Sequence, residues 1–253
     1  MPTFTLSLDL RKSTSLMDQV EQAGAFAIWL ESLSEICRKI VHDNGGIFDK
    51  FTGDGVIAHF AATERDADER DNMIYDNALA SPTIRAQAER AFTCSCELVR
   101  AIQEHLKQLR PLLRFDIGTA GPSVGLAFDD ASWSLDRDGR PIVVGKGVVN
   151  ACRLTGAPAG AIEMANNARR FVERMPNSQV LMPSIRINNV KNHKDLKDDI
   201  LPRDFMCRIR ANDASDPFPG RPRHILQKEV DRIFKDVEAM HRDRADMMKD
   251  ALD

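Results

Sequence analysis

A chain of 253 residues, of which 43% are hydrophobic and 29% charged, is long enough for one globular domain with a small appendage. The formal net charge of −3 provides no basic field of the kind that binds nucleic acid, and no apolar run reaches the roughly 20 residues of a membrane span. The first residues lack the basic and apolar regions of a signal peptide, so we expect a cytoplasmic protein that binds neither nucleic acid nor a membrane.

The first 175 residues predict an alternation of strands and helices. Apolar residues at every second position indicate strands, and apolar residues three and four apart indicate helices. The expected strands lie at 3–9, 46–51, 56–60, 114–119, 141–144 and 162–165, and the expected helices at 16–42, 83–108, 148–154 and 166–175. This βαββαβ order is typical of an α+β fold with helices on one face of the sheet.

The last third of the sequence predicts more strands and then a helix. Residues 178–210 indicate two or three strands with polar loops, and 211–221, rich in Asp, Pro and Gly, indicates a linker. From 222 to 252 a single apolar stripe predicts a helix that packs on the body or on a second chain. We therefore expect a domain over 1–210, a linker over 211–221 and a C-terminal helix over 222–253.

Two aspartates stand where their carboxylates can meet. Asp9 ends the first strand, and Asp54 lies in a hairpin turn with glycine on both sides. Two convergent carboxylates suit Mg²⁺, which completes its shell with water and phosphate oxygens. Ser13 and Thr14 follow Asp9 at a predicted helix N-terminus, which favours a phosphate group. Taken singly, Asp54 is better explained as a turn former, and Asp9 and Ser13 as helix caps.

Four segments of the sequence, taken together, resemble the motifs of class III nucleotidyl cyclases. In chain order they are Asp9-Leu10-Arg11-Lys12-Ser13-Thr14, Gly46-Ile47-Phe48-Asp49-Lys50-Phe51-Thr52-Gly53-Asp54-Gly55, Ile117-Gly118-Thr119-Ala120-Gly121 with Gly125, and Gly145-Lys146-Gly147-Val148-Val149-Asn150-Ala151-Cys152-Arg153-Leu154. The resemblance covers about residues 3–165. It implies a ferredoxin-like cyclase sheet and the conversion of a nucleoside triphosphate into a 3′,5′-cyclic monophosphate and pyrophosphate.

The resemblance also implies a two-metal site. Asp9, Asp54 and the carbonyl of Leu10 would hold two Mg²⁺ or Mn²⁺ ions at each site. One ion would lower the pKa of the ribose 3′-hydroxyl, and the other would neutralise the triphosphate and the leaving pyrophosphate. Ser13 and Thr14 would lie close to the phosphates.

The remaining roles that the resemblance implies fall to a second protomer. Arg153 would stabilise charge on the α-phosphoryl group, Asn150 would orient the ribose, and Lys50 would read the base. A late phosphate-binding lysine of the family, not assigned to either chain, has Lys191 as its candidate among Lys191, Lys194 and Lys197. Because the metal aspartates come from one chain and Arg153, Asn150 and Lys50 from the other, a homodimer with shared sites is expected.

The sequence departs from the family pattern at several positions. The family asparagine precedes its arginine by four residues, which places Val149 there and Asn150 one residue later. The second base-reading position aligns with Ile142, and a triphosphate-binding arginine aligns with Pro122. With Lys50 and Ile142 at the two base-reading positions, the base pocket has no acceptor for an exocyclic amine. The preferred substrate is therefore expected to be UTP, then CTP, then ATP.

The whole sequence is similar to stand-alone bacterial pyrimidine cyclases of anti-phage defence, whose product activates a separate effector. Two alternatives stay open: an adenylyl cyclase that makes cAMP, and a degenerate cyclase domain that binds nucleotide and regulates a partner. Retention of both Asp9 and Asp54 argues against the degenerate domain. The Gly-Gly-Asp/Glu-Glu-Phe turn of diguanylate cyclases is absent from the sequence.

Overall fold

A computed structural model of the chain describes residues 1–20, 23–62, 79, 81–114, 118–130, 132–137, 140–175, 206–210 and 220–250. Within these ranges no helix is both long enough and apolar enough to cross a membrane. The predicted strands over 178–205 and most of the predicted linker over 211–221 lie outside the described residues.

The centre of the fold is a six-stranded sheet in the order β2-β3-β1-β4-β7-β8. The strands are β1 (Thr3–Arg11), β2 (Ile47–Phe51), β3 (Gly55–Ala61), β4 (Gly121–Asp129), β7 (Ala161–Ala165) and β8 (Met206–Arg210). β1 lies at the centre and pairs antiparallel with β3 on one side and β4 on the other, while β4 and β7 run parallel. A separate hairpin is made by β5 (Trp133–Arg137) and β6 (Arg140–Val144).

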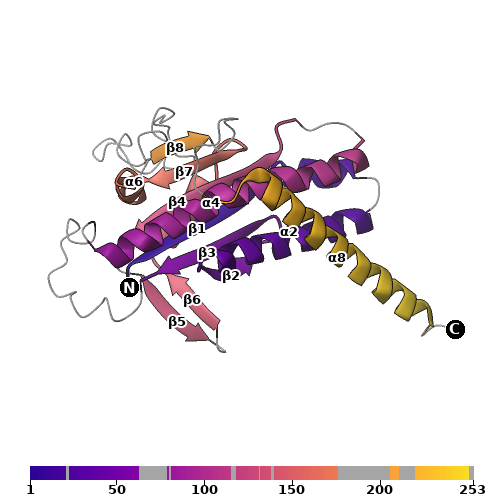
Figure 1. The fold of residues 1–253 in the computed structure, drawn as a ribbon, viewed down its shortest axis with the longest axis horizontal. Helices are drawn as coiled ribbons and strands as arrows, with labels where there is room; N and C mark the ends of the chain where they lie inside the picture. The colour runs from indigo at the N-terminus through magenta and orange to yellow at the C-terminus, as the bar shows by residue number, and fades with distance from the viewer. Residues whose placement is uncertain are drawn as a thin grey trace.

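Long helices cover one face of this sheet, as the sequence predicts. α2 (Ala23–Asp43) and α4 (Pro82–Leu109) pack on it, and α8 (Arg223–Asp250) crosses both (Figure 1). The shorter helices are α1 (Ser13–Gln19), the 3₁₀ turn η3 (Arg110–Leu112), α5 (Lys146–Leu154) and α6 (Asn166–Val172). The main core forms between the long helices and the apolar side chains of the sheet, and the α+β prediction is confirmed.

The other face of the sheet is polar and carries α5. Side chains alternate along a strand, so Phe4, Leu6, Leu8 and Leu10 of β1 enter the main core while Thr3, Thr5, Ser7 and Asp9 point away from it. Gly125, in register with Ser7, lies beneath α5: a Cβ there would be 2.0 Å from the carbonyl oxygen of Ala151. The absence of a side chain at Gly125 therefore lets α5 lie directly on the polar face.

Two predicted elements differ from the structure. The predicted helix over 16–42 is two helices, because Val20 takes an extended conformation and pairs with Leu113, and Arg114 N–H bonds to the Gln19 carbonyl. Of the strand predicted over 114–119, residues 115–117 lie outside the described residues, and Gly118 and Thr119 form a turn. The strand β4 begins at Gly121, in register with Arg11 of β1.

Arg221, just before α8, links the start of this C-terminal helix to the body of the chain. The guanidinium of Arg221 lies 2.8 Å from carboxylates of Glu97 on α4, Asp43 on α2 and Glu229 on α8. Leu226 and other apolar residues of α8 are buried in the same region. The predicted single apolar stripe of this helix thus packs on the body of the chain.

Candidate active site

Asp9 and Asp54 are brought together by the pairing of β1 with β3. The antiparallel register places Asp9 opposite Gly55, so Asp54 lies one residue beyond the cross-strand partner of Asp9. The amide of Leu10 donates to the carbonyl of Asp54 over 3.1 Å, which holds the turn against the end of β1. Gly55 has no room for a side chain, because a Cβ there would lie 2.1 Å from the carbonyl oxygen of Leu8. Both carboxylates therefore stand at one edge of the polar face.

The two carboxylates are close enough to influence each other. Burial raises the pKa of Asp9, the charge of Asp54 raises it further, and Arg11 opposes both effects. Arg11 Nη1 lies 3.1 Å from Asp9 Oδ2, and the Ser13 hydroxyl donates to Asp54 Oδ2. Lys12, at φ 62°, adopts the left-handed conformation that turns the chain from β1 into α1. This turn places Ser13 against the Asp54 carboxylate.

The residues at this edge fit a divalent cation. Mg²⁺ binds through one or two protein carboxylates, and Asp9 and Asp54 provide two. Ser123 of β4 pairs with Asp9 in register, and its buried hydroxyl has no hydrogen-bond partner within the described part of the chain. The site therefore combines a pair of mutually repelling carboxylates with an unused hydroxyl group. No cluster of three or more His, Cys, Asp or Glu side chains occurs among the described residues.

Lys50 lies on the same polar face, on the edge strand β2. The register between β2 and β3 shifts between Phe48 and Lys50, which is a bulge at Asp49. Lys50 consequently pairs with Ile57, whose own partner Ser7 belongs to the polar face. The Lys50 side chain is 55% exposed and lies 3.5 Å from Asp49. Its ammonium group thus stands on the polar side of the sheet, in an ion pair with Asp49.

Ile142 belongs to the hairpin strand β6, which contacts the strand that carries Lys50. It is half-buried on β6, and β6 contacts both β2 and α5. The hairpin of β5 and β6 therefore places the residue that aligns with the second base-reading position beside the strand that carries Lys50.

Asn150 and Arg153 lie on α5 outside its buried stripe. The buried positions of α5 are Gly147, Ala151 and Leu154. Asn150 is half-buried and Arg153 exposed, and a spacing of three residues puts them on one side of the helix. The orientation of α5 is fixed at its start, where the amide of Gly147 donates to Asp129 Oδ2 over 2.9 Å.

The other predicted positions have different surroundings. Leu10 is buried, with its side chain in the main core. Thr14 is exposed at the start of α1, and Pro122 pairs with Leu10 at the beginning of β4. Lys191 lies outside the described residues. The structure thus brings Asp9, Asp54 and Ser13 together directly, while Lys50, Asn150 and Arg153 stand on other elements of the same face.

Sequence reasoning missed three features of this site. The ion pair of Arg11 with Asp9, the position of Ser123 beside Asp9 and the bulge at Asp49 all depend on strand register. The sequence does contain a signal for the position of Ser123. Ser123, Gly125 and Ala127 are small residues at alternate positions, which indicates a strand face closely covered by another element.

Comparison with known proteins supports the fold. No protein-family profile matches the sequence, and no curated protein matches it. Among solved structures, the adenylyl cyclase CyaB from P. aeruginosa is similar with a TM-score of 0.58 and 18% identity, over 85% of this chain and 96% of that one. The guanylyl cyclase Cya2 is similar with a TM-score of 0.56 and 18% identity, over 83% of this chain and 91% of that one. The guanylate cyclase domain of RhGC from Catenaria anguillulae, in complex with GTP, is similar with a TM-score of 0.52 and 13% identity, over 82% of this chain and 94% of that one. The chain therefore has the fold of adenylyl and guanylyl cyclase catalytic domains.

Proposed function

We propose that the protein is a metal-dependent nucleotidyl cyclase, which converts a nucleoside triphosphate into its 3′,5′-cyclic monophosphate and pyrophosphate. The observation that carries this proposal is the convergence of Asp9 and Asp54 at the edge of a polar sheet face. Lys50 stands on the same face, and α5, which packs on this face, carries Arg153 on its exposed side. A nucleotide held between the carboxylates of one chain and the Lys50 and Arg153 of a second chain would meet negative and positive groups, which matches the charge distribution of a metal-bound triphosphate.

In the reaction, the 3′-oxygen of the ribose forms a bond to the α-phosphorus, and the bond from the α-phosphorus to the bridging oxygen of the leaving pyrophosphate breaks. Divalent ions bound by Asp9 and Asp54, with the Leu10 carbonyl, would lower the pKa of the attacking hydroxyl and neutralise the triphosphate. Ser13 would keep the Asp54 carboxylate oriented through their hydrogen bond. Arg153 would stabilise negative charge on the α-phosphoryl group, and Asn150 would hold the ribose.

The active form is proposed to be a homodimer. Arg153 points away from the body of its own chain, and Val149 on the same side of α5 is 50% exposed. An exposed valine beside an exposed arginine suits a surface that a second copy covers. The guanylyl cyclase domain of RhoGC from Blastocladiella emersonii, with a TM-score of 0.50 and 15% identity, is described as a non-canonical dimer. In the homodimer proposed for this protein, the metal residues of one chain would meet Lys50, Asn150 and Arg153 of the other.

The preferred substrate is proposed to be UTP, followed by CTP. Lys50 donates hydrogen bonds and cannot accept them, and Ile142, on a strand that contacts β2, offers no acceptor for an exocyclic amine. A base with carbonyl groups at its edge satisfies such a pocket best. By its resemblance to anti-phage pyrimidine cyclases, the protein would make a second messenger that a separate effector protein senses. The proposal also includes Lys191 as a phosphate-binding residue. It places the catalytic domain at residues 1–210 and the C-terminal helix from residue 222.

The test is turnover of the four ribonucleoside triphosphates, each with Mn²⁺, with products separated by chromatography and identified by mass. The proposal expects a cyclic monophosphate and an equal amount of pyrophosphate, formed fastest from UTP. Saturable binding of nucleotide without any product, in a dimer shown to be intact, would identify a nucleotide-binding regulatory domain instead.

A further inference from the structure

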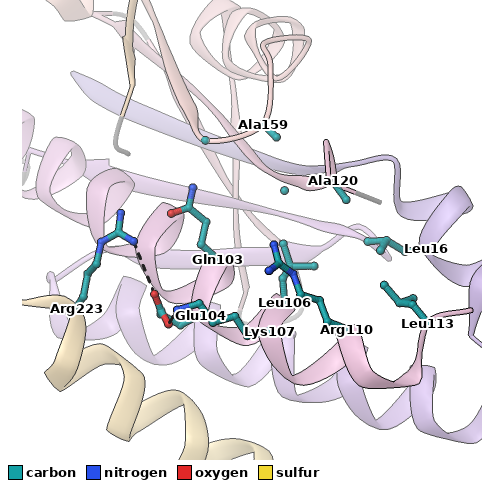
Figure 2. Close-up of a pocket in the computed structure, with 13 residues that line it drawn as sticks. Leu16, Gln103, Glu104, Leu106, Lys107, Arg110, Leu113, Ala120, Ala159 and Arg223 are labelled. Carbon is teal, nitrogen blue, oxygen red and sulfur yellow. Dashed lines mark hydrogen bonds and ion pairs between the residues drawn. The ribbon is translucent and has the colours of Figure 1, made fainter. Parts of the chain in front are cut away.

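A cavity on the helix side of the fold is separate from the polar face. It has a volume of about 390 Å³ and lies between α4, η3, the start of β4, the loop before β7 and the first residue of α8 (Figure 2). This volume falls within the range of roughly 300–1,000 Å³ that is usual for small-molecule sites. Leu16 and Leu113 stand at one end of it, and Gln103 and Arg223 at the other (Figure 2).

The charged side chains around this cavity favour an anion. Lys107, Arg110 and Arg223 are cations, and Glu104 is the one carboxylate among the described residues that line it. Glu104 is 7% exposed and forms ion pairs with Lys107 and with Arg223, the latter at 3.7 Å. The cavity therefore carries an excess of positive charge after its carboxylate has been neutralised.

Arg110 is the residue best placed to bind a ligand. No hydrogen bond or ion pair to its guanidinium occurs within the described part of the chain, and Figure 2 shows it between Leu106 and Leu113. A guanidinium binds a phosphate group through two parallel hydrogen bonds, which a lysine cannot do. The neighbouring leucines offer an apolar wall beside this charge.

We propose that this cavity is a binding site for a phosphate monoester with a compact apolar body, distinct from the metal site. Arg110 and Lys107 would bind the phosphate, and Leu113 would contact the apolar part. Leu16 follows Ser13 by one turn of α1, and Gly121 of the cavity wall pairs with Arg11 of β1. Because the two sites share these segments, the test has to keep the metal site free of metal ions and nucleotide.

The experiment measures binding of phenyl phosphate to the full chain by isothermal titration calorimetry, in EDTA and without nucleotide. The expected result is saturable binding at one site per chain, tighter than the binding of inorganic phosphate. Arg110→Gln and Lys107→Gln should each weaken it by about tenfold or more. Arg232→Gln, which removes an exposed charge on α8 away from the cavity, should leave the affinity unchanged.

Two results would overturn the proposal. One is the absence of saturable binding by phenyl phosphate. The other is an affinity that Arg110→Gln lowers no more than Arg232→Gln does. Since Lys107 and Arg110 are exposed, both variants should fold, and circular dichroism checks this. The assay contains neither metal nor triphosphate, so its outcome is independent of whether the protein is a cyclase.

Discussion

Replacing Gly125 by alanine should displace the helix that carries Arg153. A Cβ at this position would lie 2.0 Å from the carbonyl oxygen of Ala151 and 2.8 Å from the Cβ of Leu154. An ordinary contact between carbon and carbonyl oxygen is about 3.3 Å, so α5 and β4 would have to separate by roughly 1.3 Å. Both obstructing groups belong to the helix itself, and no flexible side-chain end can move away in their place.

Two effects follow from this displacement. Overpacking of this kind costs roughly 1–3 kcal/mol, which at about 2–4 °C per kcal/mol lowers the melting temperature by about 2–12 °C. A displacement of about 1 Å in a catalytic group lowers turnover by on the order of a hundredfold. Gly125→Ala should therefore remain folded at room temperature yet lose most of its cyclase activity.

The assay combines thermal melting, followed by circular dichroism, with initial rates of cyclic nucleotide formation. The control is Gly24→Ala, because no atom lies within 4 Å of a Cβ at that position of α2. If Gly125→Ala melts at a lower temperature but turns over normally, Arg153 is not a catalytic group. If it matches the wild type in both measurements, α5 does not pack on β4 as described.

Three further predictions concern the anchor of α8, the dimer and the base. Burial opposes ionisation of Glu97, but hydrogen bonds and charge from Arg221 outweigh it, so the pKa of Glu97 lies below its usual value of 4.5. The stability from this ion pair is therefore fully present above about pH 4.5 and is lost as the pH falls through the lower folded-state pKa. Melting temperatures between pH 3 and pH 6 should fall less steeply with acid in Arg221→Met, and parallel curves would contradict the assignment. Mixing inactive Asp54→Asn with inactive Arg153→Ala should restore part of the activity, because one site of the heterodimer keeps both wild-type halves; a mixture that stays inactive after demonstrated subunit exchange would rule out shared sites. Lys50→Glu should lower UTP turnover most, by about tenfold to a hundredfold, in competition among the four triphosphates. A clear wild-type preference for ATP in that assay would overturn the proposed role of the base pocket.

The arrangement of the sheet was predictable where local signals were strong. The turn around Asp54 and the alternation of β1 predicted the hairpin and the central strand, and the structure has both. The convergence of Asp9 and Asp54 followed from placing their strands side by side. The break near Val20 was not predictable in the same way, because it depends on pairing with Leu113, more than ninety residues later.

The rest of the candidate site depends on register, which a single sequence does not specify. A bulge at Asp49 decides that Lys50 shares the face of Ser7, and without it the side chain would point into the helix layer. Gly121 and Gly125 lie within β4, whereas the sequence predicts a strand that ends before both of them. Both features depend on where a strand pairs.

The most direct test of the central claim is cyclic nucleotide formation by the wild type and by Asp54→Asn, with Mn²⁺ and labelled triphosphate. Asp236→Asn is the matched control, since it removes one exposed carboxylate on α8. Loss of a carboxylate that holds catalytic metal should cost several kcal/mol of transition-state stabilisation, a fall of at least about a hundredfold. We expect product from the wild type and from Asp236→Asn, and almost none from a folded Asp54→Asn. Equal rates in all three proteins would show that the Asp9–Asp54 pair is not the catalytic centre.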